Sequence, residues 1–349
     1  MRSFAIDALL ICVALSCAGQ TSHEPYTFFK NSIGLQDGEI ADIQRGQAVT
    51  KVLSTKTPAE VAVFGAVFIR ASIEDYLKAA QNVNSLRGSP NYLGIQVFST
   101  PPQLSDLKGF VLEEQDIKDL KNCEPAKCEL QLPSESMEEF KKQVNWSGSD
   151  VTTQVNSLAQ KMALELLVRY QKEGNSALGS YSDKEQPVHV IEQFEALLSR
   201  GPSLSHYLPD LKQYLLDYPR TQFPNIESFF FWEQVKFGLK PTLRMNQMIV
   251  YRGSRPSGPI ASVAIKQLYA SHYFQTALDL SVCVADNSRP DEKGFYLITA
   301  KGSRQAGLTG PKGSIVRKNA VSKARSLLES SLMHFKSILE SQHAPASSE

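Results

Sequence analysis

The pattern of apolar and polar positions in the first third of the chain predicts a strand, a helix and a second strand. Residues 61–70 (VAVFGAVFIR) are dense in β-branched and aromatic side chains with partial alternation, which is typical of a half-buried strand. Ser72 is placed to cap a helix over residues 73–83, whose apolar positions recur at helical spacing. Residues 92–98 predict the second strand, because the prolines that follow it remove donors from a strand ladder.

A pattern with the period of a helix occupies residues 133–238. Apolar residues recur every three or four positions over 155–170, and two shorter stretches before Pro219 show the same spacing. Within this block, residues 229–232 (FFFW) form a compact aromatic cluster, which we interpret as a plug between layers, with Trp232 as an alternative wall of a cavity. The block therefore predicts a set of amphipathic helices whose apolar faces pack on another surface.

Strand patterns return after residue 240 and are separated by short polar or Gly- and Pro-rich segments. Connections of this length favour an antiparallel meander. A final amphipathic helix, with apolar positions from Ala320 to Leu339 along one side, closes the chain. The four predicted strands cover residues 243–251, 261–269, 272–285 and 295–300.

This order of elements resembles the helix-grip fold of the START/polyketide-cyclase (SRPBCC) superfamily. The resemblance covers roughly residues 57–130 and 240–341 and rests on element order. It implies an α+β fold in which a curved antiparallel sheet surrounds a long C-terminal helix. A single helix does not fill such a sheet, so an apolar cavity is expected between them, and members of the superfamily hold lipids, sterols or polyketides there.

The predicted domain organisation follows from this resemblance. A discontinuous helix-grip-like domain is interrupted by the helical insertion and flanked by an N-terminal segment and a disordered tail. The expected boundaries are 1–18 for a signal peptide, 19–56 for the N-terminal segment, 57–132 and 239–342 for the helix-grip-like domain, 133–238 for the insertion and 343–349 for the tail.

Three short segments also resemble an uncharacterised family of exported bacterial proteins. They are residues 269–274 (YASHYF), the loop from Cys123 to Cys128 with the ELQLP that follows it, and residues 237–241 (FGLKP). Members of that family often follow the last strand with an Asn-Arg-Ser-Arg-like run, and of this run only Arg304 matches clearly here. The resemblance implies export and no particular activity.

The N-terminus predicts export independently of any resemblance. Arg2 precedes an apolar stretch over residues 8–18 that is too short to span a bilayer, as in a secretory signal peptide. A buried N-terminal helix is the alternative, and Cys17 lies in a weak lipoprotein box that would make it a lipid anchor. We expect a periplasmic or secreted protein with no transmembrane helix in the mature chain, and we rank soluble export above the anchor.

The cysteines support the same compartment. With Cys12 and Cys17 in the predicted leader, Cys123, Cys128 and Cys283 remain. Cys123 and Cys128 flank a Pro-containing turn, and export makes a local disulfide between them the favoured interpretation. A structural zinc site needs four ligands, which this pair lacks, and Cys283 lies in an apolar run typical of a buried, inert thiol.

Composition and motif content exclude several classes of function. The chain of 349 residues is 42% hydrophobic with a formal net charge of +1, so it is globular and has no global field that attracts nucleic acid. It contains no nucleophile elbow, no His-Glu-x-x-His, no phosphate loop and no dinucleotide fingerprint. The six histidines form no i, i+4 pair. We therefore expect neither a metal nor a cofactor.

His272 is the titratable residue with the most interesting surroundings. In the predicted strand it shares one face with Phe274, while Tyr269 and Tyr273 lie on the other. His272 then pins the polar group of a ligand or acts as an acid or base with a tyrosine hydroxyl. The alternative is a core histidine that is hydrogen-bonded to the backbone.

Every charge between Lys301 and Leu328 is positive. Within this run, Arg304 and Arg317 are suited to bidentate pairing with an anionic headgroup or a carboxylate. The alternative is a solvated helix face with the loop that leads into it.

These observations give three hypotheses for function. The leading one is an exported, non-enzymatic protein that binds a hydrophobic or lipid-like small molecule between the sheet and the last helix, with Tyr269, His272, Phe274, Arg304 and Trp232 as candidate ligand-binding residues. The second is a cyclase- or hydrolase-type enzyme in the same cavity that uses His272 with a neighbouring tyrosine. The third is a protein-interaction module, which predicts an exposed apolar patch on the helices of residues 155–218.

Overall fold

The computed structural model of the chain describes residues 24–87, 91–199, 207–236, 240–255, 258–286 and 293–342. The predicted signal peptide 1–18, with Cys12 and Cys17, lies outside the described residues, as does the predicted tail 343–349.

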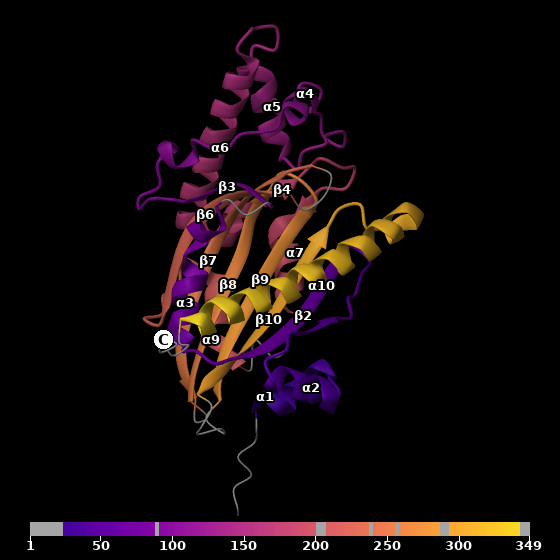
Figure 1. Cartoon of the computed structure of the whole chain (residues 1–349). Helices are drawn as coiled ribbons and strands as arrows, with labels where there is room; N and C mark the ends of the chain where they lie inside the picture. The colour runs from indigo at the N-terminus through magenta and orange to yellow at the C-terminus, as the bar shows by residue number, and fades with distance from the viewer. Residues whose placement is uncertain are drawn as a thin grey trace, which may run out of the picture.

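A curved, eight-stranded antiparallel sheet forms the centre of the fold (Figure 1). Its strands lie in the order β1-β2-β10-β9-β8-β7-β6-β3, so β1 and β3 are its edges. The strands β7 to β10 are sequential neighbours and form the meander that the sequence predicts, and β2 pairs with β10. The strands are β1 Val49–Val52, β2 Glu60–Ile69, β3 Tyr92–Val97, β6 Ile226–Val235, β7 Thr242–Arg255, β8 Gly258–Ala270, β9 Phe274–Asp286 and β10 Gly294–Gln305; β4 Ser180–Tyr181 and β5 Val188–His189 form a separate pair.

Helices cover the two faces of the sheet unequally (Figure 1). The N-terminal helices, the second half of the helix Val151–Glu173 and the helices of residues 190–217 pack on the convex face, whereas α10 and α3 lie on the concave face. The helices of residues 114–143 pack with the first half of Val151–Glu173 beyond one end of the sheet. The fold is therefore α+β, with a long C-terminal helix against a curved antiparallel sheet, as predicted. The helices are α1 Glu24–Thr27, η1 Phe28–Ile33, α2 Asp37–Gln44, α3 Ile73–Gln81, η2 Val83–Leu86, η3 Leu104–Leu107, α4 Glu114–Leu120, α5 Ser134–Gln143, α6 Val151–Glu173, η4 Gly174–Leu178, α7 Val190–Leu198, α9 Pro209–Asp217 and α10 Gly310–Ser341.

The helical insertion ends earlier than the sequence pattern predicts. Its last predicted residues form β6, which pairs with β3 on one side and β7 on the other. Phe229 and Phe231 pack in the concave-face core, while Phe230 and Trp232 pack under the helices of the convex face. Because both faces of β6 are covered, its sequence is a continuous aromatic run without the alternation that marks a half-buried strand.

The helix α10 rests directly on β2 through two leucines. A Cβ atom placed on Gly65 would lie 2.7 Å from Leu332 Cδ1 and 3.0 Å from Leu328 Cδ2. Two polar contacts hold the same helix, one at its middle and one near its C-terminal end: Arg325 Nε donates to Thr50 Oγ1 at 3.0 Å, and Glu340 Oε1 accepts from the Arg70 amide at 2.9 Å. The helix is therefore packed tightly along β2 and is not separated from it by a void.

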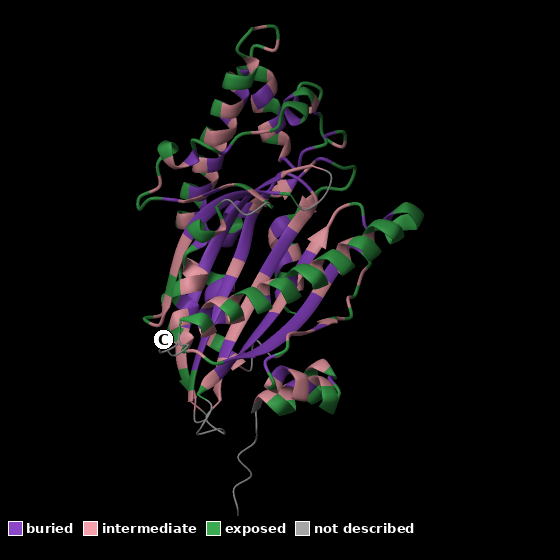
Figure 2. Ribbon diagram, in the orientation of Figure 1, coloured by how far each residue is buried: buried purple, intermediate pink, exposed green. Residues whose placement is uncertain are grey.

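Burial differs sharply between the sheet and this helix. Figure 2 shows the strands largely buried, while α10 carries exposed residues along most of its length. The sheet is consequently the core of the molecule, and α10 is a strap across one part of its concave face.

The convex-face core contains a buried lysine. Lys266, on β8, donates to Tyr170 Oη at 3.0 Å and to Asn175 Oδ1, and its ammonium lies 4.2 Å from the centre of the Phe194 ring. Burial lowers the pKa of Lys266 to about 7, because the charged form is poorly solvated there. The group is therefore held by neutral oxygens and aromatic rings.

We expect Gly65→Ala to destabilise the fold by about 1–3 kcal/mol, because the added methyl group overlaps Leu328 and Leu332. Urea denaturation measures this as a lower transition midpoint. Gly38→Ala is the matched control, since no atom lies within 4 Å of its added Cβ and alanine favours the helix α2. Equal stability of the two variants would contradict direct contact between α10 and β2.

We expect the free energy of unfolding of the wild type to rise with pH above 7, relative to Lys266→Met, by about 1.4 kcal/mol per pH unit. The folded pKa of Lys266 is about 7 and its ordinary value is 10.5, so between these values only the unfolded chain holds the proton and acidification favours unfolding. Chemical denaturation at pH 7, 8 and 9 measures the slope. Lys142→Met, at an exposed position, is the control, and its free energy of unfolding should change with pH as that of the wild type does. If Lys266→Met also followed the pH dependence of the wild type, the assignment to Lys266 would be contradicted.

Candidate functional site

Two of the five ligand-binding candidates from the sequence, Trp232 and Tyr269, lie on the convex side of the sheet, whereas the Phe274 ring lies 5.4 Å from the Arg244 guanidinium. Trp232 faces the convex side, where its Nε1 donates to the Asp106 carbonyl at 2.7 Å. It lines a shallow surface pocket of about 470 Å³ together with residues of β3. Tyr269 is packed in the convex-face core against Tyr181, and burial holds its pKa well above the ordinary range. Neither side chain reaches the space beside α10.

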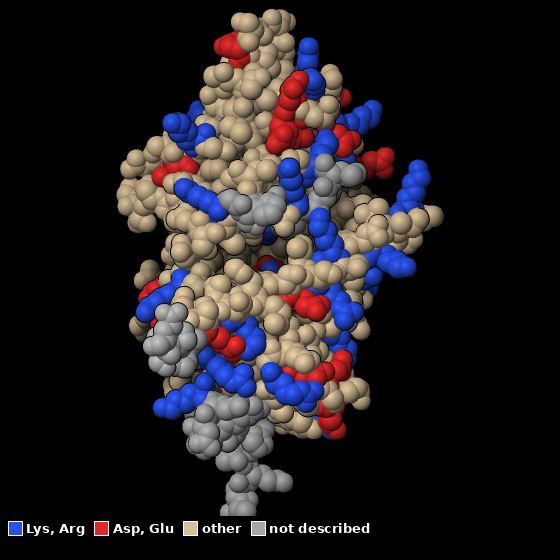
Figure 3. Space-filling model, viewed as in Figure 1, with Lys and Arg blue, Asp and Glu red and all other residues tan. Residues whose placement is uncertain are grey.

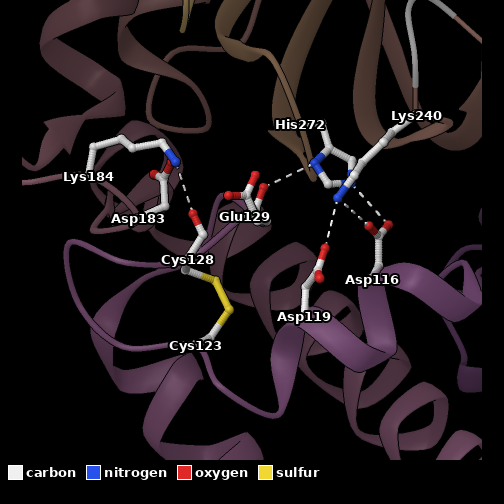
Figure 4. The surroundings of a disulfide bond; sticks show 9 residues. All are labelled: Asp116, Asp119, Cys123, Cys128, Glu129, Asp183, Lys184, Lys240 and His272. Atoms are coloured by element: carbon white, nitrogen blue, oxygen red, sulfur yellow. Dashed lines mark hydrogen bonds and ion pairs between the residues drawn. A yellow bond between two sulfur atoms is a disulfide. The ribbon is translucent and has the colours of Figure 1, made fainter.

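His272 lies in the turn between β8 and β9 and not in a strand. The predicted alternation of His272 and Phe274 against Tyr269 and Tyr273 therefore does not apply, since Tyr273 adopts a φ of 64° in this turn. His272 Nε2 lies 3.0 Å from Asp116 Oδ2 and Nδ1 lies 3.2 Å from the Glu129 carbonyl (Figure 4). Both ring nitrogens thus face oxygen acceptors, and neither is directed at a tyrosine hydroxyl.

A charged network surrounds this histidine. Lys240 Nζ lies 2.8 Å from Asp119 Oδ2 and 3.5 Å from Asp116 Oδ1 (Figure 4). Burial opposes ionisation of Asp119, but hydrogen bonds from Lys240 and Gln115 outweigh it and lower the pKa of this carboxyl. Asp116 and Asp119 both belong to α4, so the network fixes α4 to the β8–β9 turn and the start of β7. The geometry of these contacts therefore indicates a structural role.

The predicted disulfide is present beside this network. Cys123 and Cys128 are bonded to each other, and the Cys128 carbonyl accepts from Lys184 Nζ at 3.0 Å (Figure 4). Cys283 is buried in the concave-face core, and burial raises the pKa of its thiol. The interpretation of Cys283 as a buried thiol is confirmed.

The two predicted anion-binding arginines hold the start of β2. Arg304 Nε donates to Gln275 Oε1 at 3.1 Å, and its Nη1 lies 3.7 Å from Glu60 Oε1. Arg317 Nε donates to the Pro58 carbonyl at 3.1 Å and its Nη2 to the Glu60 carbonyl at 3.3 Å. Both guanidinium groups therefore bind acceptors supplied by the chain itself.

A set of polar side chains that the sequence analysis did not single out lies on the concave face. We call it the concave polar cluster: Glu233 on β6, Arg244 and Asn246 on β7, Gln267 on β8, Asp279 on β9 and Lys301 on β10. The strand register places Glu233 opposite Arg244, Asn246 opposite Gln267, and Asp279 opposite Lys301. The space-filling view shows this face hollowed above α10, with charged side chains of both signs inside (Figure 3).

Two ion pairs form opposite walls of the cluster. Arg244 Nη1 lies 3.0 Å from Glu233 Oε1, and Lys301 Nζ lies 2.6 Å from Asp279 Oδ2. The Glu233 and Arg244 side chains are 7% and 11% exposed, whereas those of Asp279 and Lys301 are 28% and 37% exposed. One wall is therefore buried and the other is open to solvent.

Sheet curvature brings these walls within electrostatic range. In a flat sheet, β6 would lie about 14 Å from β9 and about 19 Å from β10, where solvent ions screen most of the interaction. Yet the pKa of Glu233, raised chiefly by burial, is also affected by Asp279 and by Lys301. The pKa of Tyr92 on β3, likewise raised chiefly by burial, is affected by Glu233, Arg244 and Asp279. Both ion pairs consequently belong to one polar region of the concave face, on strands that the register joins in sequence.

A sequence signal for the cluster exists, although it is subtle. Glu233 interrupts an aromatic strand, and Arg244 and Asn246 occupy alternate positions at the start of another apolar strand. Charged and amide side chains at alternate positions of otherwise apolar strands indicate that one end of a sheet face is polar. Strand order and curvature, which the sequence pattern does not contain, are needed to bring them together.

Within the described residues, no group of three or more His, Cys, Asp or Glu side chains is arranged to hold a metal ion. None of the described helices is both long and apolar enough to cross a bilayer. The predicted apolar patch on residues 155–218 reduces to Val168, the one large hydrophobic side chain exposed among the described residues of that range.

No family model, curated protein or solved structure matches the chain.

We expect His272→Ala to destabilise the protein by about 2–4 kcal/mol, because the buried Asp116 carboxylate loses a hydrogen-bonded partner. Thermal or urea unfolding measures the loss. The exposed His334→Ala is the control and should stay within about 0.5 kcal/mol of the wild type. If both variants were equally stable, the network around His272 would not anchor α4.

Proposed function

We propose that the protein binds a small amphipathic molecule in the hollow of the concave face, beside α10. The observation that carries this proposal is the incomplete cover of that face: α10 and α3 pack over its apolar part, and the concave polar cluster lies beyond them. A sheet face that is neither fully covered by protein nor fully exposed is the usual setting of a ligand site.

The lining changes character along the strands, which favours a ligand with two different ends. Val263 on β8 is buried in the apolar core, Ile265 is partly buried at its edge, and Gln267 belongs to the polar cluster. These residues share one face of β8 because side chains alternate along a strand. A molecule lying along this strand would place its apolar part near Ile265 and its polar part at the cluster.

Tight contact between α10 and β2 narrows the proposed position. Because Leu328 and Leu332 already lie against Gly65, the ligand does not lie beneath the middle of α10. It lies instead over β8 and β9, between α10 and the polar cluster. This differs from a cavity enclosed between helix and sheet, which the helix-grip resemblance implies.

An enzymatic role for His272 has no specific support from this geometry. Its Nε2 faces Asp116, its Nδ1 faces the Glu129 carbonyl, and the Tyr273 hydroxyl accepts from the Lys240 amide at 2.9 Å. A general base needs a nitrogen that is free to reach a substrate proton. The binding function is therefore the one we put forward.

Export is part of the same proposal. The disulfide between Cys123 and Cys128 is typical of an oxidising compartment, and residues 1–18 have the composition of a signal peptide. We propose that the mature protein acts outside the cytoplasm, with lipid attachment at Cys17 as the alternative end of processing.

Native mass spectrometry of protein purified from its own host tests both the binding function and export. We expect a stoichiometric adduct that organic extraction releases, on a chain that lacks the first 18 residues. An adduct mass carried covalently on a chain beginning at Cys17 would instead indicate the lipid anchor. A homogeneous, unliganded protein in repeated preparations would contradict the binding function.

A further inference from the structure

We propose that the polar end of the bound molecule is an uncharged, hydroxyl-bearing group such as a sugar or a polyol, held by the concave polar cluster. This inference rests on the proposed binding function and adds the chemical class of the group that is recognised. It is drawn from the balance of charge in the cluster and from its unused hydrogen-bond acceptors.

The charges of the cluster compensate one another in pairs. Glu233 is paired with Arg244 at 3.0 Å, and Asp279 is paired with Lys301 at 2.6 Å. An ionic headgroup would have to leave water and compete with a partner that is already in place, so it would gain little from either wall. A neutral group avoids that cost and can still form hydrogen bonds to the charged side chains.

Between the walls lie two amides whose oxygens are unused. Asn246 and Gln267 are 0% and 1% exposed. Asn246 Nδ2 donates to Glu233 Oε1 at 3.1 Å, and Gln267 Nε2 donates to the Phe274 carbonyl at 3.0 Å. Asn246 Oδ1 and Gln267 Oε1 have no hydrogen-bond partner among the described residues. Leaving such buried acceptors unpaired is unfavourable.

Rotating either amide by 180° does not remove this shortage. Asn246 would then direct its oxygen at the Glu233 carboxylate, and Gln267 would direct its oxygen at the Phe274 carbonyl. Both arrangements bring two acceptors together, so the present orientation is fixed by the surrounding acceptors. Asn246 Oδ1 and Gln267 Oε1 are therefore left without a donor among the described residues, and the hydroxyl groups of a ligand supply it.

Tyr92, whose pKa is affected by residues of the cluster, is also consistent with a neutral polyol. Burial and the nearby Glu233 raise the pKa of Tyr92, so its phenol stays uncharged and can both donate and accept. A carboxylate or phosphate offers acceptors only, and a quaternary ammonium offers no donor. A hydroxyl-rich group matches both the unpaired amide oxygens and the paired charges of the walls.

The test uses four amphiphiles that share a dodecyl chain and differ in the head: dodecyl maltoside, dodecylphosphocholine, dodecanoate and dodecyltrimethylammonium. Each is titrated below its critical micelle concentration by isothermal calorimetry. We expect the maltoside to bind at least about tenfold more tightly than the others, which corresponds to about 1.4 kcal/mol. Equal binding of all four, or tighter binding of a charged head, would overturn the inference and leave the binding function standing. Binding of none would count against the binding function itself.

Two variants locate the contact. Gln267→Met removes the unpaired acceptor and should weaken maltoside binding several-fold without changing dodecanoate binding. Gln247→Met is its matched control: Gln247 is also 1% exposed, but it lies on the opposite face, where its Oε1 accepts from Tyr170 Oη at 2.8 Å. Equal effects of the two variants on maltoside binding would overturn the assignment of the head to this cluster.

Lys301→Met provides a second measurement at a partly exposed position, in case Gln267→Met does not fold. It leaves the Asp279 carboxylate without the ammonium that lies 2.6 Å away. We expect tighter binding of dodecyltrimethylammonium to this variant, since the wall then carries a net negative charge. An unchanged order of the four heads would show that the balance of charge does not select the ligand.

Discussion

The curvature of the eight-stranded sheet is the constraint on which the rest of the structure depends. It lets β6 and β10, four steps apart in the strand order, influence each other electrostatically across the concave face. It also means that α10 can cover only part of that face, because a straight helix follows one strip of a curved surface. The same property thus leaves part of the concave face uncovered, and Glu233 and Lys301 lie on strands four steps apart on that face.

The convex face differs from the concave face in how it is covered and in how it holds a buried charged group. Helices from the N-terminal segment and from the insertion pack on it, and a charged group that it buries, Lys266, is held by neutral oxygens and aromatic rings. Ion pairs occur where loops meet the sheet, as between Lys240 and Asp119, and there they hold elements together. Charged residues at the end of the sheet therefore hold α4 against the sheet. Those on the concave face line the hollow instead.

Much of the architecture could be predicted from the sequence because it follows from local pattern. The meander, the C-terminal helix and the bonded pair Cys123 and Cys128 all depend on short-range spacing, turn composition and loop length. The strand β6 was missed because burial on both faces hides its alternation. His272 was placed in a strand because the alternation was extended into a turn, where the left-handed backbone of Tyr273 breaks it. The concave polar cluster was missed because its members come from five strands, whose order only the fold specifies.

The position of Cys283 offers a consequence of a different kind. Its thiol is fully buried on β9, in the core shared with Leu328 and Leu332 of α10, while the other two described cysteines are bonded to each other. A thiol reagent in solution therefore reaches this sulfur only when the core between the sheet and its covering helices opens locally. The rate at which the native thiol is modified therefore reports how often this local opening occurs. A ligand that contacts both α10 and the sheet would lower that rate, and no engineered cysteine is needed to measure it.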